Sequence, residues 1–176
     1  NPGQRELPFC IHTRYSTQQA ILEDIVASLY AQGMRKLIIL SGHGGNNFKG
    51  MIRDLAFVYP DFLIIAADWF SIVPPKDYFE AVVDDHAGES ETSVMMHYHP
   101  ELVNLAEAGD GESRPFAIPS LDEKVGWAPR HWDKATVDSG VGNPKKASAE
   151  KGERYMKPVV EKLAKLFTEV GLGSLY

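Results

Sequence analysis

The 176-residue chain has little of several features that would place it in a special class. Cys10 is its one cysteine, which excludes an internal disulfide and fits a reducing cytoplasm better than secretion. No apolar stretch has the length needed to span a bilayer. Basic residues form no run longer than Lys145–Lys146, and the net charge of -6 gives no general attraction to nucleic acid or anionic membranes. We therefore expect a soluble, cytoplasmic protein whose partners are small molecules or proteins.

Two short apolar runs predict the strands of the fold. Residues 37–40 and 62–67 are continuous apolar segments, which are typical of strands buried on both faces of a parallel sheet. Between these two segments, the apolar residues within positions 48–59 recur at helical spacing. The order helix, strand, helix, strand indicates an α/β fold with a right-handed crossover, and the length suits one globular domain over residues 1–176.

Start and stop signals predict the remaining helices. Ser16 and Gln19 are interpreted as a capping box that opens the first helix, and Gly33 as its left-handed stop. A further helix is expected over residues 92–98, and it is expected to continue or restart over residues 100–108. The last helix, near the C-terminus, is expected to be kinked or restarted at Pro158.

A glycine-rich loop follows the first predicted strand. It reads Ser41-Gly42-His43-Gly44-Gly45-Asn46-Asn47, and loops at the carboxyl ends of parallel strands line the crevice where α/β proteins bind ligands. Its three glycines permit positive φ, and amides at the start of the next helix can face an anion. The histidine can instead present one ring nitrogen to a metal, or it can cap the helix. The loop is therefore a candidate phosphate or metal site.

A second segment, from Asp84 to Ser93, combines four carboxylates with the His86 imidazole. Carboxylates at the start of a helix are partly explained by the helix dipole and by capping. That explanation does not cover His86, which precedes the small pair Ala87–Gly88. A histidine beside a metal-bound carboxylate can transfer protons at neutral pH. The segment is thus a candidate for acid–base chemistry.

Both segments resemble one known family. The loop Ser41-Gly42-His43-Gly44-Gly45-Asn46 is similar to the Asn-Gly-His-Gly-Gly-Asn loop of the creatininase family of amidohydrolases. The stretch His86-Ala87-Gly88-Glu89-Ser90-Glu91-Thr92-Ser93 resembles that family's His-Ala-Gly-Glu-x-Glu-Thr-Ser segment. Gly140-Val141-Gly142-Asn143-Pro144 is similar to its C-terminal Gly-Val-x-Gly-x-Pro pattern. The resemblance therefore runs from near the start of the chain almost to its end.

This resemblance implies a fold and an activity. The expected fold is a three-layer α/β/α arrangement with a mainly parallel sheet. The expected activity is hydrolysis of a nonpeptide or cyclic amide C–N bond by metal-activated water at a site with two divalent ions, zinc or manganese. By resemblance, His43 and Glu91 are metal ligands, with Glu89 as a reserve for Glu91, and His86 transfers the proton. A small-molecule amide substrate and a homo-oligomer, in the form of a hexamer, are implied in the same way.

Other positions are expected to shape the loop or contact the substrate. These are Gly44, Gly45 and Asn46 of the loop, Glu89, and Trp69, the tryptophan nearest to the position where creatininase carries one. The family's N-terminal ligand stretch has no counterpart here, so we expect an N-terminal segment to be missing from this sequence. Two alternatives stay open: a phosphate- or nucleotide-binding α/β protein that uses the glycine-rich loop, and a non-catalytic structural subunit.

Overall fold

The computed structural model describes residues 2–174 and 176, which divide into two compact units. We call Thr13–Val73 with Val159–Tyr176 the sheet unit, and Asn1–His12 with Pro74–Pro158 the His86 unit. Each unit is described by itself. The single domain expected over residues 1–176 stays a prediction.

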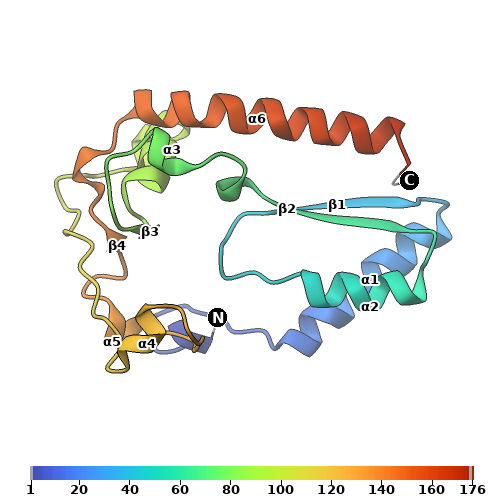
Figure 1. Ribbon diagram of the computed structural model, residues 1–176, viewed down its shortest axis with the longest axis horizontal. Helices are drawn as coiled ribbons and strands as arrows, with labels where there is room; N and C mark the ends of the chain where they lie inside the picture. Colours follow the sequence, from blue (N-terminus) through green and yellow to red (C-terminus); the bar gives the residue numbers. More distant parts are fainter. Residues whose placement is uncertain (1, 175) are drawn as a thin grey trace. The chain divides into compact units, whose positions relative to one another are not determined.

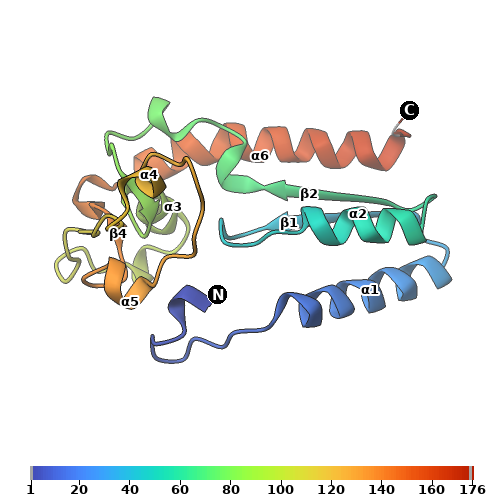
Figure 2. The ribbon, with the colours of Figure 1, turned by 60° about the horizontal axis from the view of Figure 1, so that its bottom comes forward.

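The sheet unit has the helix–strand alternation that the apolar pattern predicts. Two parallel strands lie between helices: α1 and α2 on one side and the C-terminal half of α6 on the other (Figures 1 and 2). Its elements are α1 (Tyr15–Ala31), β1 (Lys36–Ser41), α2 (Lys49–Val58), β2 (Leu63–Asp68), the 3-10 helix η2 (Trp69–Ser71) and the latter part of α6 (Ala149–Leu172).

The two strands pair in parallel along their whole length. Lys36 is opposite Leu63, and Ser41 is opposite Asp68. Their carboxyl ends therefore meet at one edge, so the glycine-rich loop after β1 and the 3-10 helix after β2 start side by side. The strands are less buried than their apolar runs predict, since Leu40 is 50% exposed.

The helix ends confirm one predicted signal and correct another. Gly33 has φ +87, and the amide of Met34 donates to the carbonyl of Leu29, as in a Schellman motif. The predicted capping box is wrong: α1 already begins at Tyr15, so Ser16 lies inside its first turn. Gln19 instead donates to the carboxylate of Asp54 on α2 at 3.2 Å.

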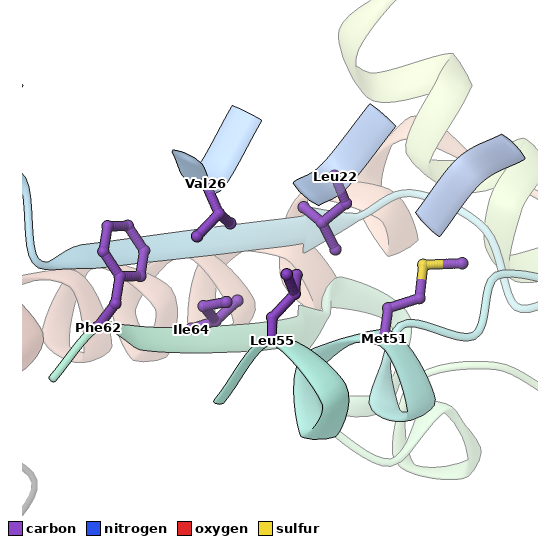
Figure 3. Close-up of a cluster of buried hydrophobic side chains, with 6 residues drawn as sticks. All are labelled: Leu22, Val26, Met51, Leu55, Phe62 and Ile64. Atoms are coloured by element: carbon purple, nitrogen blue, oxygen red, sulfur yellow. The ribbon is translucent and has the colours of Figure 1, made fainter. Parts of the chain in front are cut away.

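A compact apolar cluster holds α1 and α2 on the sheet. Figure 3 shows its six side chains gathered together: two from α1, two from α2, Ile64 from β2, and Phe62 from the residue just before β2. The cluster consists of Leu22, Val26, Met51, Leu55, Phe62 and Ile64. All are at most 8% exposed, and burial of a side chain of this size stabilises the fold by about 1.5–3 kcal/mol.

The His86 unit is built from short elements. A two-stranded antiparallel ladder, β3 with β4, stands beside α3. The elements are η1 (Pro2–Gln4), η3 (Pro75–Asp77), β3 (Asp84–His86), α3 (Glu89–Tyr98), η4 (Pro100–Leu102), α4 (Pro119–Asp122), α5 (Trp132–Ala135), β4 (Val141–Gly142), η5 (Pro144–Lys146) and the first part of α6.

Prolines act differently on the two long helices. The helix predicted over residues 92–98 ends at Tyr98, and its expected continuation over residues 100–108 does not form, because Pro100 interrupts it and only the 3-10 turn η4 follows. By contrast, α6 continues through Pro158, and no second helix starts there. Among the described residues, no helix is both long and apolar enough for a membrane span.

The apolar cluster of the sheet unit should control its stability. Leu55→Ala removes a 3%-exposed side chain and should lower the free energy of unfolding by about 2–5 kcal/mol, measured by chemical denaturation. Phe57→Ala on the same helix, where the ring is 89% exposed, is the matched control and should change stability by less than about 0.5 kcal/mol. Equal effects of the two substitutions would contradict this role of the cluster.

Candidate functional site

His43 lies in the loop between β1 and α2, at the edge where the parallel strands end. Its ring nitrogen Nδ1 accepts a hydrogen bond from the amide of Gly45 at 2.9 Å, and its carbonyl accepts from the amide of Asn46 at 3.1 Å. Ser41, which is 2% exposed, donates its hydroxyl to the same carbonyl. The side-chain amide of Asn46 in turn donates to the Ser41 hydroxyl at 3.4 Å. These bonds fix a tight turn that carries the imidazole.

The loop glycines do not have the role expected of them. Neither Gly42 nor Gly44 adopts a positive φ, and a Cβ added at Gly42 would meet no atom within 4 Å. A Cβ at Gly44 would touch the ring of Phe70 at 3.8 Å, which is an ordinary contact. Phe70 packs edge-on against Trp69, with ring centroids 5.9 Å apart. Gly44 thus lies near an aromatic pair, and the backbone at Gly42 and Gly44 is not unusual.

Two backbone amides of the glycine-rich loop are engaged within the loop. The amides of Gly45 and Asn46 both donate to His43, and the amide of Lys49 donates to the side chain of Asn47 at 3.3 Å. A phosphate-binding loop needs several backbone N–H groups directed at the anion. The geometry therefore disfavours the phosphate interpretation.

His86 stands at the end of β3 beside a β-bulge. Asp84 is opposite Gly142 and His86 is opposite Val141, so two steps on β3 match one step on β4. Such a bulge breaks the alternation of side chains and redirects them. The next residue, Ala87, has φ +49, a left-handed conformation that costs a non-glycine residue about 1–2 kcal/mol.

The turn after His86 brings a carboxylate to its ring. Glu91 on the first turn of α3 accepts the amide of Ala87 on Oε2 at 2.7 Å, and the same oxygen lies 3.9 Å from Nδ1 of His86. A Cβ at Gly88 would lie 2.1 Å from a carboxylate oxygen of Asp84, so the Asp84 side chain would have to move. The glycine therefore leaves room for the Asp84 carboxylate beside this turn.

Asp84 caps the same helix from the strand. Its carboxylate accepts the amide of Ser90 at 3.0 and 3.3 Å. Burial raises the pKa of Asp84, and the hydrogen bonds from Ser90 oppose that rise. The carboxylates of Asp84 and Glu91 thus both bind backbone amides around the start of α3.

Glu89 is fully buried and both of its oxygens are engaged. Oε2 accepts the amides of Glu80 and Ala81 at 2.9 and 2.8 Å, and Oε1 accepts from the ammonium of Lys151 at 2.5 Å. Lys151, on α6, also bonds the carboxylate of Glu80 at 2.9 Å. These contacts give Glu89 the task of joining the chain at residues 80–81, α3 and α6.

The charges of this cluster depend on one another. The hydrogen bonds that the Lys151 ammonium donates, first to Glu89 and next to Glu80, raise the pKa of Lys151. Lys146 and then Lys151 lower the pKa of Glu80 to about 2. A lowered carboxyl pKa stabilises the folded state above the ordinary glutamate pKa of 4.5, and that contribution is lost as the pH falls toward 2.

Two residues that the sequence did not single out contact the His86 strand. The Trp132 ring meets the His86 ring edge-on, and Arg130 pairs with Asp85. Nothing in the local sequence pattern signals either contact, because the partners are about 45 residues apart in a loop-rich stretch. A tryptophan in such a loop-rich stretch is the one hint that the sequence offers. In the structure this tryptophan, Trp132, is buried at 8% exposed.

The predicted metal ligands lie in different units. His43 belongs to the sheet unit, and Glu91 belongs to the His86 unit, so their convergence on one cation stays a prediction. Across residues 2–174 and 176, no three or more His, Cys, Asp or Glu side chains form a metal-binding group. The two donors form at most part of a ligand set.

The chemistry of the two donors fits a divalent cation. Imidazole nitrogen and carboxylate oxygen are ordinary ligands of zinc and manganese. In His43, however, Nδ1 accepts the Gly45 amide, so a neutral ring carries its proton on Nε2. Binding through Nδ1 would displace that amide, and binding through Nε2 would require the proton on Nδ1. His43 therefore fits as a ligand after a change in this one hydrogen bond.

The buried position of Glu89 gives a stability prediction. Glu89→Gln replaces one carboxylate oxygen with an NH2 group and removes the charge beside Lys151. We expect a loss of about 3 kcal/mol, the low end for a buried pair that loses one partner, because Lys151 keeps Glu80. Glu153→Gln, on the exposed face of α6, is the control for denaturation followed by circular dichroism. A loss below about 1 kcal/mol for Glu89→Gln would show that the buried pair is not structural.

Comparison with known proteins gives a consistent family. A family model described as "Creatininase: Creatinine amidohydrolase" matches residues 1–167. The creatinine amidohydrolase of Pseudomonas putida is 24% identical over 169 residues, which are 88% of this chain and 63% of that protein. A mycofactocin precursor peptide peptidase of Mycobacterium ulcerans is 33% identical over 132 residues, covering 72% of this chain and 45% of the relative. The chain thus spans less than two thirds of the length of either relative.

Solved structures agree. A candidate creatinine amidohydrolase from Bacteroides fragilis is 83% identical, with a TM-score of 0.96 over 100% of this chain and 70% of that chain. A creatininase variant of the Zn-Zn type shares the fold, at 23% identity and a TM-score of 0.68 over 93% of this chain and 67% of that chain. These likenesses confirm the predicted α/β fold and the resemblance seen in the motifs. The chain belongs to the creatininase family.

Proposed function

We propose that the protein is a metal-dependent amidohydrolase that cleaves a nonpeptide or cyclic amide C–N bond, with His86 as its proton-transfer residue. Family membership over residues 1–167 supports the reaction class. The observation that carries the residue assignment is the contact of Glu91 with His86, with 3.9 Å between Oε2 and Nδ1.

The Glu91 contact suits a proton-transfer histidine. A carboxylate beside one ring nitrogen is a common partner of a proton-transfer histidine, because it favours one orientation of the imidazole. Because the amide of Ala87 holds Oε2 of Glu91 in place, this carboxylate is itself fixed. His86 is about one third exposed, with a side-chain value of 31%, so a substrate can reach it.

The chain's other residues have supporting tasks in this proposal. His43 and Glu91 would hold a divalent cation, which supplies an activated water because a cation lowers the pKa of water to about 7. His86 would give a proton to the leaving nitrogen. The loop around His43 would be shaped by Gly44, Gly45 and Asn46. The substrate would be bordered by Trp69, beside this loop. Glu89 would shape the site by holding residues 80–81 rather than by binding the ion.

Peptide hydrolysis is the second candidate. The relative with the higher identity, 33% over 132 residues, is a peptide peptidase, whereas the creatinine amidohydrolase is 24% identical. Both reactions break an amide C–N bond, so the same proton donor serves either.

A homo-oligomer, in the form of a hexamer, is also part of the proposal. Sedimentation velocity checks this oligomeric state.

Substrate identity and the role of His86 can be tested together. The protein is assayed against creatinine, other cyclic amides, formamides and short peptides. His86→Gln should lower kcat about 10²–10⁴-fold on any amide that the protein hydrolyses, because the general acid is lost. His99→Gln, at a ring that is 59% exposed and paired with Glu101, is the control. Equal kcat for the wild type and His86→Gln would remove His86 from the proposal.

Metal content tests the ligand assignment. We expect about two divalent ions per full-length chain by elemental analysis of the purified protein, as in two-metal hydrolytic sites. His43→Ala should reduce that number, whereas His12→Ala, at an exposed position, should not. Amide hydrolysis by protein that stays free of metal would contradict the metal-dependent mechanism.

A further inference from the structure

Trp132 lies against the histidine to which we assign proton transfer. The ring centroids of His86 and Trp132 are 5.5 Å apart, and the ring planes meet at 87°. This edge-to-face arrangement is a favourable geometry for aromatic pairs. Trp132 is 8% exposed, whereas the His86 side chain is 31% exposed. Trp132 is therefore the buried partner of this contact, and His86 is the more exposed partner whose ring must be oriented.

The indole of Trp132 is itself held firmly. Its Nε1–H donates to the carbonyl of Ser139 at 2.8 Å, and its own carbonyl accepts the hydroxyl of Thr136 at 2.7 Å. The guanidinium carbon of Arg130 lies 4.5 Å from the centre of the ring. Cations over an indole face are attracted by its quadrupole. Contacts on the ring edge, on the ring face and at the backbone therefore restrain the indole.

A second contact ties the same segment to the same strand. Arg130 forms an ion pair with Asp85, the residue before His86. In a regular strand, neighbouring side chains point to opposite faces, but the bulge in β3 interrupts that alternation. Consecutive residues of β3 can therefore both contact the segment 130–132.

We propose that Trp132 is a positioning residue for His86, and that Arg130 acts through it. The inference rests on the proposed function, because it assumes that His86 transfers the proton. Rotation about the Cβ–Cγ bond of histidine has broad minima, so the ring needs outside contacts to define its plane. Glu91 approaches one ring nitrogen, and Trp132 fixes the plane in which that nitrogen faces Glu91.

Two readouts test this role. In protein labelled on histidine, Trp132→Leu should shift and broaden the NMR signals of the His86 ring, which are assigned by their loss in His86→Gln. The signals of His12, His43, His97 and His99 should stay in place. With creatinine as the probe substrate, kcat should fall about 10-fold with KM unchanged, since misplacement of a proton donor affects the reaction step rather than ground-state binding.

Two further variants separate positioning from folding. Trp132→Phe keeps a ring at this position and should restore most of the His86 signal and of kcat. Trp127→Leu removes a tryptophan that is 86% exposed, and it should leave both readouts as in the wild type. If Trp132→Leu does not fold, Trp132→Phe carries the test through a smaller NMR shift, because it loses the bond to Ser139.

The outcomes distinguish this inference from the proposed function. Unchanged His86 ring signals in both Trp132 variants would overturn the inference, whatever the activity. A large loss of kcat in His86→Gln with full kcat in Trp132→Leu would also overturn it, while leaving the proposed function intact. Full activity in His86→Gln would overturn both. If Trp132 acts through His86, Trp132→Leu should have no further effect on kcat in the His86→Gln background.

Discussion

The buried carboxylate of Glu89 is the constraint on which the His86 unit depends. Removed from water, it must have all its hydrogen bonds met by the protein, and it takes them from two backbone amides and from Lys151 on α6. This requirement fixes where α3 begins. Once that start is fixed, Glu91 sits two residues along the chain in the first turn and meets the His86 ring. The contact between Glu91 and His86 thus depends on how the buried charge of Glu89 is satisfied.

Much of the fold could be predicted because its signals are local. The apolar runs gave both parallel strands to within one or two residues, and Gly33 marked the end of α1 through its need for positive φ. The predictions that failed also did so for physical reasons. A capping box is a weak signal, and the helix simply began earlier, at Tyr15. One predicted helix ends at Tyr98, two residues before Pro100, whereas Pro158 lies inside α6, which continues through it.

The candidate site was predictable only in part, for a related reason. Its motifs named His43, His86 and Glu91, because each lies in a short stretch whose composition is unusual. The contacts of Trp132 and Arg130 could not be found in that way, since they join residues about 45 positions apart and depend on how a loop-rich segment returns to β3. The glycine-rich loop shows the opposite error: its composition suggested unusual backbone at Gly42 and Gly44, and the chain adopts ordinary φ there.

The β-bulge has a consequence for how this site can vary. Two steps on β3 match one on β4, so the direction of the imidazole is set by the number of backbone units and not only by the identity of the side chains. Deleting Asp85, the residue between Asp84 and His86, would restore the regular pleat and turn the imidazole to the opposite face, even with His43, His86 and Glu91 retained. The number of residues in the bulge of β3 therefore matters for the site as much as the presence of the histidine.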